Sequence, residues 1–167
     1  HAGFVGKYYI EKLARIPVEV DIASEFRYRS PILDESTLTI VISQSGETSD
    51  TLAALKEAKR LGSKTMAITN VVGSSIAREA DQVVYTWAGP EIAVASTKAY
   101  TTQLITVFML ATYMAGLKET ISADYAKSLI SSLRKVPAQI SEILEDVEPI
   151  KTFAQQYGFN EDVLRVI

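Results

Sequence analysis

The chain has 167 residues, of which 47% are hydrophobic and 22% charged, and it contains no cysteine. This composition supports one folded domain of ordinary size and excludes a disordered chain, disulfides, zinc–thiolate sites and a cysteine nucleophile within these residues. The net charge of −3 gives no general attraction for nucleic acid or for an anionic membrane. From the N-terminus, apolar residues at helical spacing predict a helix over residues 2–16, which Pro17 ends.

The next segments predict strands and helices in alternation. Residues 18–22 alternate apolar and charged side chains, as a strand does, and residues 24–28 favour a short helical turn. Short β-branched runs predict buried strands at 38–42, 65–69 and 83–86, with helices at 48–61 and 75–80 between them. This alternation over residues 1–86 predicts an α/β fold with a doubly wound parallel sheet.

The remaining residues are helical in pattern. We expect helices over 97–117, 122–135 and 138–157, with Pro137 separating the last two and a break at Pro149. They form a helical C-terminal tail that is expected to pack on the sheet.

The uncharged stretch Ala99 to Leu117 is long enough to cross a bilayer. Its threonines and Gln103 lower its affinity for lipid, so a buried helix in a soluble core is the prediction. His1 to Gly6 lack the features of a secretory signal, and we expect a cytoplasmic protein.

The turn after the strand at 38–42 carries the chemistry. Ser43, Ser45 and Thr48 supply hydroxyl donors, and Gly46 allows positive φ and close approach of the backbone. The helix that follows adds unpaired N–H groups and the positive end of its dipole. The turn has no lysine, so a monophosphate without a metal fits better than a nucleotide. The simpler interpretation is that these residues are only helix caps and a turn glycine.

The turn Ser-Gln-Ser-Gly-Glu-Thr-x-Asp-Thr resembles the signature of the SIS (sugar isomerase) domain family. His1-Ala2-Gly3, residues 24–29 and residues 87–103, which include Val-Ala-Ser-Thr-Lys, resemble the first SIS half of the glucosamine-6-phosphate synthases, the glutamine–fructose-6-phosphate aminotransferases. The resemblance runs to about Tyr157. It implies a flavodoxin-like, three-layer α/β/α SIS fold over residues 1–157.

The resemblance also implies the site. It makes Ser43, Gln44, Ser45 and Thr48 phosphate and sugar contacts, Val94 a backbone contact near the reacting end of the sugar, and Ser96 a further candidate. Ser96 and Thr97 are equally explained as a cap of the long helix. The resemblance implies no metal and no cofactor.

No catalytic residue is assigned within this chain. The family places its Schiff-base lysine elsewhere, so we interpret Lys98 as a surface or ion-paired lysine, and His1 receives no role. Glu47 and Glu91 are the only nearby acid–base candidates, and Glu47 is better explained as a first-turn acid of the following helix.

The family pattern places a strand and a Cys-Gly-Thr-Ser turn before His-Ala-Gly, and we expect both to be absent here. Residues 158–167 are expected to begin a following strand. Residues 162–167 are a candidate to fill the sheet position of the absent strand, within the chain or by exchange with a neighbour.

The resulting hypothesis is a sugar-phosphate-binding part of the enzyme that makes glucosamine-6-phosphate from fructose-6-phosphate and glutamine, inactive on its own. Its expected partners are fructose-6-phosphate or glucosamine-6-phosphate, the remaining domains of the parent enzyme and a second copy in a homodimer. No nucleic acid and no membrane partner are expected. The alternatives are a non-catalytic SIS sensor of sugar phosphates and a stand-alone sugar-phosphate isomerase.

Overall fold

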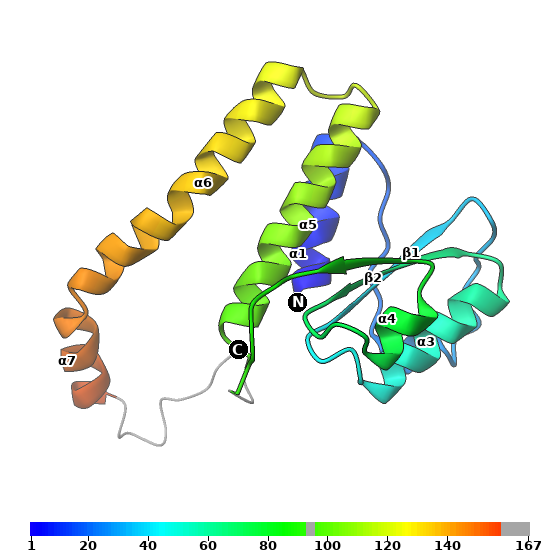
Figure 1. The fold of residues 1–167 in the computed structure, drawn as a ribbon, viewed down its shortest axis with the longest axis horizontal. Coiled ribbons are helices and arrows are strands. Elements are labelled where there is room, and N and C mark those ends of the chain that lie inside the picture. The colour runs from blue at the N-terminus through cyan, green and yellow to red at the C-terminus, as the bar shows by residue number, and fades with distance from the viewer. Residues whose placement is uncertain (93–95, 158–167) are drawn as a thin grey trace. The chain divides into compact units, whose positions relative to one another are not determined.

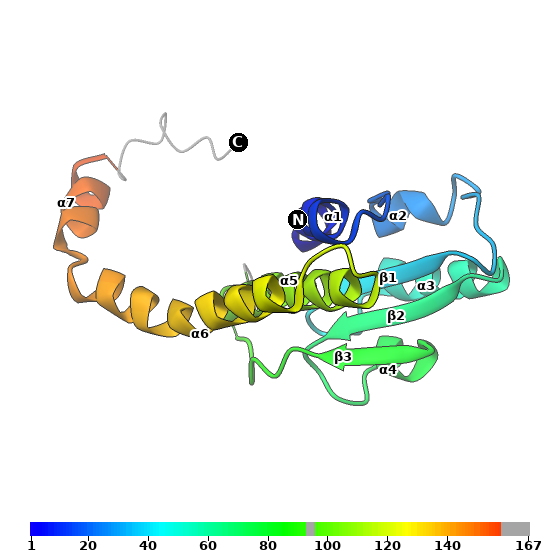
Figure 2. The ribbon, with the colours of Figure 1, turned by 90° about the horizontal axis from the view of Figure 1, so that it is seen from above.

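The computed structural model describes residues 1–92 and 96–157. The chain divides into two compact units, His1–Ala126 and Lys127–Ile167. The first unit contains a parallel sheet of the strands β1 (Leu38–Ser43), β2 (Lys64–Thr69) and β3 (Gln82–Tyr85), in the order β1-β2-β3. All three strands therefore end at the same edge of the sheet, and Figure 2 shows β2 and β3 pointing the same way.

Helices connect and cover these strands. They are α1 (Ala2–Tyr9), which continues as a π-helical turn (Ile10–Ala14), α2 (Ala23–Phe26), α3 (Ser49–Arg60), α4 (Ser75–Glu79) and α5 (Lys98–Leu117). Figure 1 shows α3 and α4 together beside the sheet and α1 alongside α5. The predicted doubly wound α/β fold is confirmed, because helices lie on both sides of a parallel sheet.

One apolar cluster joins α3 and α4 to the sheet. Leu55 is fully buried and lies in a cluster with Val41, Ala67 and Ile76. Side chains alternate between the two faces of a strand, so Val41 and Ala67 mark the face that α3 and α4 cover. This cluster fixes the position of α3, and with it the turn that leads into α3.

The expected strand at residues 18–22 is wrong. These residues form no strand, although β1 lies at the edge of the sheet in the described part of the chain. Side-chain contacts hold the segment instead: the Val18 N–H donates to Glu11 Oε1 at 3.1 Å, and Arg29 pairs with Glu19 at 3.0 Å and with Asp21. Alternation of side chains favours an extended backbone, but a strand also needs a neighbour to exchange hydrogen bonds with.

The second unit contains most of α6 (Ala123–Glu145) and all of α7 (Glu148–Tyr157). The expected break at Pro137 is wrong, because α6 continues through it. Pro137 is exposed, so water can take the place of the missing N–H donor at the carbonyl one turn earlier. The break falls just before Glu148, and Pro149 lies in the first turn of α7, where a proline has no helical hydrogen bond to lose.

Two further expectations concern the stretch 99–117 and the C-terminus. The stretch 99–117 is helical, as predicted, and lies within α5. Among the described residues, no helix has both the length and the apolar character needed to cross a membrane. The expected strand over 158–167 lies outside the described residues.

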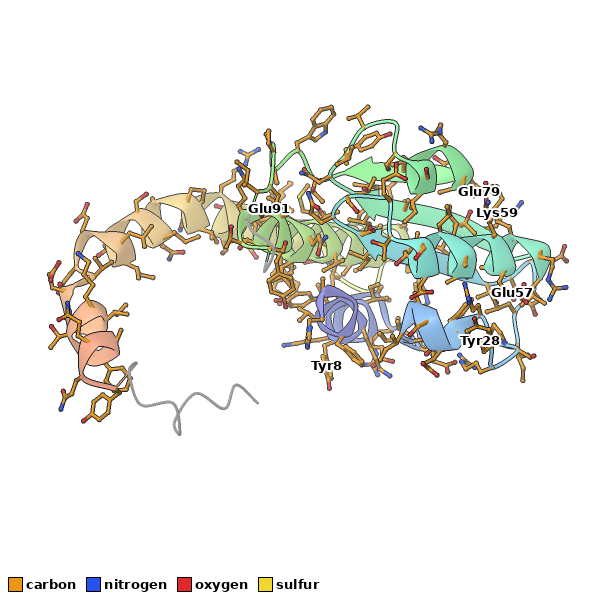
Figure 3. All side chains as sticks on the ribbon, turned by 90° about the horizontal axis from the view of Figure 1, so that it is seen from below. Tyr8, Tyr28, Glu57, Lys59, Glu79 and Glu91 are labelled. Carbon is orange, nitrogen blue, oxygen red and sulfur yellow. The ribbon has the colours of Figure 1, made fainter. Side chains whose placement is uncertain are left out.

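A polar clamp joins the starts of β2 and β3. Asp81 Oδ2 accepts from the Thr65 N–H at 2.9 Å and from the Thr65 hydroxyl at 2.7 Å, and Lys59 Nζ lies 3.4 Å from Asp81 Oδ1. Figure 3 shows Lys59 beside Glu79, whose carbonyl it also contacts at 2.6 Å. The Thr65 hydroxyl first, then its N–H and Lys59, hold the pKa of Asp81 below its ordinary value.

We expect these contacts of Asp81 to make the free energy of unfolding depend on pH. A lowered pKa in the folded state means that Asp81 contributes stability above its unfolded pKa, ordinarily near 3.8, and that this contribution is lost as the pH falls through the folded pKa. Asp81→Asn keeps an acceptor for Thr65 but cannot titrate. Urea unfolding is measured from pH 6 down to about pH 3. The free energy of unfolding should fall less steeply with decreasing pH for the variant than for the unmodified chain. Equal slopes would contradict the clamp.

Candidate functional site

The predicted phosphate turn joins β1 to α3, as expected. Ser43 is the last residue of β1, and Thr48 precedes the first helical residue of α3, Ser49. Gly46 has a φ of +67°, which confirms that the turn needs the left-handed region that glycine adopts without cost. The turn therefore lies at the carboxyl edge of a parallel sheet, where ligands of open α/β sheets bind.

Hydroxyl groups organise the turn from within. Ser43 is buried, and its Oγ accepts from the Gly46 N–H at 3.1 Å and lies 3.0 Å from Thr48 Oγ1. The Ser45 hydroxyl accepts from the Glu47 N–H at 3.2 Å. Ser45 and Thr48 are at least partly exposed. Ser43 can give its proton to Thr48, which leaves the proton of the Thr48 hydroxyl for a ligand.

Thr48 occupies the N-cap position of α3 without acting as a side-chain cap. Its hydroxyl makes no capping hydrogen bond with the helix and contacts Ser43 instead. The first N–H groups of a helix have no partner within it, so this arrangement leaves those at the start of α3 to water or a ligand. Of the simpler interpretation, the turn glycine is present at Gly46, whereas the Thr cap is not.

The loop after β2 supports the turn from the side, which the sequence analysis did not anticipate. The Gln44 carbonyl accepts from the Asn70 N–H at 3.1 Å. A Cβ built on Gly46 would lie 2.5 Å from Ser74 Cβ and 2.8 Å from Thr69 Oγ1. Thr69 and Ser74 thus fill the space beside Gly46, and glycine is needed there for packing of the two loops as well as for its φ.

Asn70 links this region to the segment after β3. Its Oδ1 accepts from the Thr86 hydroxyl at 3.1 Å and the Ala88 N–H at 2.8 Å, and its Nδ2 donates to the Gly89 carbonyl at 2.7 Å. Asn70 could have been predicted from the sequence as a residue of this region, because it directly follows β2. Polar residues at the strand ends of a parallel sheet gather at one edge.

Glu91 caps α5. Its Oε2 accepts from the Thr97 N–H at 3.1 Å and from the Ala99 N–H at 3.0 Å, and Figure 3 places it where α5 begins. Thr97 therefore does not cap the helix with its own side chain. Ser96 is partly exposed and has a φ of +57°. Val94, the other predicted contact of this segment, lies outside the described residues.

Glu47 also contacts a helix start, but not the one expected. Its Oε1 accepts from the N–H of Ser75, the first residue of α4, at 2.8 Å. The Ser75 contact first, and the charge of Arg78, hold the pKa of Glu47 below its ordinary value. Glu47 and Glu91 thus both accept hydrogen bonds from the N–H groups at helix starts.

The fold and the turn together define a sugar-isomerase type of α/β domain, and comparison with known proteins agrees. The SIS domain family model matches residues 1–113, and the chain belongs to that family. It is similar to the glutamine–fructose-6-phosphate aminotransferases [isomerizing] of Caldanaerobacter subterraneus subsp. tengcongensis, at 61% identity over 166 residues, and of Clostridium tetani, at 59% over 163 residues. These matches cover 99% and 98% of this chain but 27% of each relative.

A solved structure agrees with both the fold and the sequence match. The C-terminal domain of glucosamine-fructose-6-phosphate aminotransferase from Francisella tularensis has a TM-score of 0.87 and 40% identity. The match covers 92% of this chain and 44% of that one. The chain therefore spans only part of the length of the relatives that it matches.

Proposed function

We propose that residues 43–48 bind the phosphate group of a sugar phosphate. The observation that carries the proposal is the N-cap of α3, whose Thr48 hydroxyl contacts Ser43 and not the helix. A phosphate at this place would receive the Ser45 and Thr48 hydroxyls and the N–H groups of the first turn, with Gln44 beside it. This is the combination by which helix starts hold anions.

The parent activity that fits this site is that of a glutamine–fructose-6-phosphate aminotransferase [isomerizing], the name that its curated relatives carry. Fructose-6-phosphate and glucosamine-6-phosphate are then the ligands, and the further domains of such an enzyme are the partners. In this proposal the described residues bind and orient the sugar, and proton transfer belongs to residues elsewhere. The cytoplasm is the proposed compartment, because the proposed ligands are free sugar phosphates, and a homodimer stays an expectation.

The roles of the predicted contacts differ in this proposal. Ser45 and Thr48 donate to the phosphate, whereas Ser43 is buried and acts mainly by orienting Thr48. Val94 and Ser96 stay predictions for the sugar end.

Removal of a donor tests the proposal. Ser45→Ala and Thr48→Ala should each weaken binding of fructose-6-phosphate by about 1–3 kcal/mol, since each removes a hydrogen bond to a charged group. Isothermal titration calorimetry measures the change. Thr48→Ser keeps the hydroxyl and should bind as the unmodified chain does. Ser36→Ala removes a hydroxyl at the opposite end of β1, where it contacts Asp34, and should change nothing. Unchanged affinity of both donor variants would refute the assignment.

A further inference from the structure

The phosphate turn is tied to α4 at two points. The Ile76 N–H donates to the Gly46 carbonyl at 3.0 Å, and the Ser75 N–H donates to Glu47 Oε1 at 2.8 Å. The preceding residue, Ser74, packs against Gly46. The start of α4 therefore lies against the middle of the turn.

The start of α4 has a side-chain cap of its own besides the Glu47 contact. Ser74 already caps that helix, because its hydroxyl accepts from the Ala77 N–H at 3.4 Å. Glu47 is exposed, so its carboxylate is not a buried group that needs this hydrogen bond. What the bond does is join residue 47 of the turn to an element 28 residues later in the chain.

The contact also settles where a negative charge of the turn lies. A carboxylate that faced a bound phosphate would oppose binding by charge repulsion. The Glu47 carboxylate is directed to the Ser75 N–H, and the guanidinium of Arg78 contacts the Ser75 hydroxyl at 3.2 Å and the Gly73 carbonyl. The acidic side chain is thus held at α4.

We propose that Glu47 is a positioning residue for sugar-phosphate binding: its hydrogen bond to Ser75 holds the turn in the binding geometry. This inference rests on the proposed function of residues 43–48. Glu47 does not touch the ligand. It holds the backbone between Ser45 and Thr48, so that both hydroxyls and the first N–H groups of α3 point to one place. The second tie, from Ile76 to Gly46, remains when the first is removed, so loss of Glu47 should weaken binding and not abolish it.

The two ends of the hydrogen bond can be removed separately. Glu47→Ala removes the acceptor. Ser75→Pro removes the donor N–H and suits its position, because proline is favoured at the first residue of a helix and Ser74 has the extended φ of −60° and ψ of 163° that a residue before proline needs. Glu47→Gln keeps an acceptor oxygen, and Ser75→Ala keeps the N–H, so these are the matched controls.

Calorimetry with fructose-6-phosphate then tests the role of the Glu47–Ser75 hydrogen bond. Glu47→Ala and Ser75→Pro should each raise Kd about tenfold, and the double variant should be no weaker than either single one, because both remove the same bond. Glu47→Gln and Ser75→Ala should bind within about threefold of the unmodified chain. Thermal unfolding of each variant is measured as well. If Glu47 only stabilised the fold, the loss of affinity would come with a loss of thermal stability.

The outcomes separate the two proposals. If the unmodified chain binds no fructose-6-phosphate, both the proposed function and the positioning role of Glu47 are overturned. Two results would overturn only the positioning role of Glu47. In the first, the unmodified chain binds and both Glu47→Ala and Ser75→Pro bind equally well. In the second, the effects of these two variants on Kd multiply in the double variant.

Discussion

Gly46→Ala is expected to raise the Kd for fructose-6-phosphate at least about a hundredfold and to lower the free energy of unfolding by about 2–4 kcal/mol. Alanine at a φ of +67° is strained, and its methyl group would lie 2.5 Å from Ser74 Cβ and 2.8 Å from Thr69 Oγ1. Either the turn or the loop that carries Ser74 must move, and movement of the turn misplaces the donors of Ser45 and Thr48. Calorimetry and urea unfolding measure the two effects.

Gly62→Ala separates the backbone strain from the steric clash. Gly62 has a φ of +89°, but no atom lies within 4 Å of a Cβ built there. This variant should lose only about 1–2 kcal/mol of stability and should keep its affinity. If Gly46→Ala loses no more than Gly62→Ala and binds normally, the close packing of the two loops does not govern the site.

Leu55→Ala is expected to lower the free energy of unfolding by about 2–5 kcal/mol, the range for a fully buried leucine. Leu55 is 0% exposed and fills the space between β1, β2 and α4 with Val41, Ala67 and Ile76. These neighbours belong to separate elements, which cannot all move into the cavity at once. Urea unfolding gives the change. Leu38→Ala, at a residue that is 43% exposed, should cost less than about 1 kcal/mol. Equal losses would show that α3 is not anchored as described.

The parts of the fold that local pattern decides were predictable. Three strands, the helices between them and the positive φ of Gly46 follow from β-branched runs, helical spacing and the special freedom of glycine. The segment 18–22 was mispredicted because alternation is a local signal, whereas a strand depends on a neighbour. Pro137 was mispredicted because the cost of a proline within a helix depends on whether its surroundings are exposed.

The site was predictable in its residues but not in its contacts. The hydroxyls of Ser43, Ser45 and Thr48 mark the turn in the sequence. The structure alone shows that the first is buried and orients the third, whereas Ser45 is partly exposed and Thr48 is exposed. Thr69 and Ser74 reach Gly46 from more than 20 residues away. No spacing rule along the chain signals such contacts, because they depend on how two neighbouring strands of a parallel sheet are placed.

Amide chemical shifts test phosphate binding by residues 43–48 directly. Two-dimensional NMR spectra of the ¹⁵N-labelled chain would be recorded during titration with fructose-6-phosphate and, separately, with fructose. We predict that the amides of Ser45, Gly46, Glu47, Thr48 and Ser49 shift and saturate with fructose-6-phosphate and stay in place with fructose at the same concentrations. Saturating shifts elsewhere in the chain, with these five amides unmoved, would contradict phosphate binding by residues 43–48.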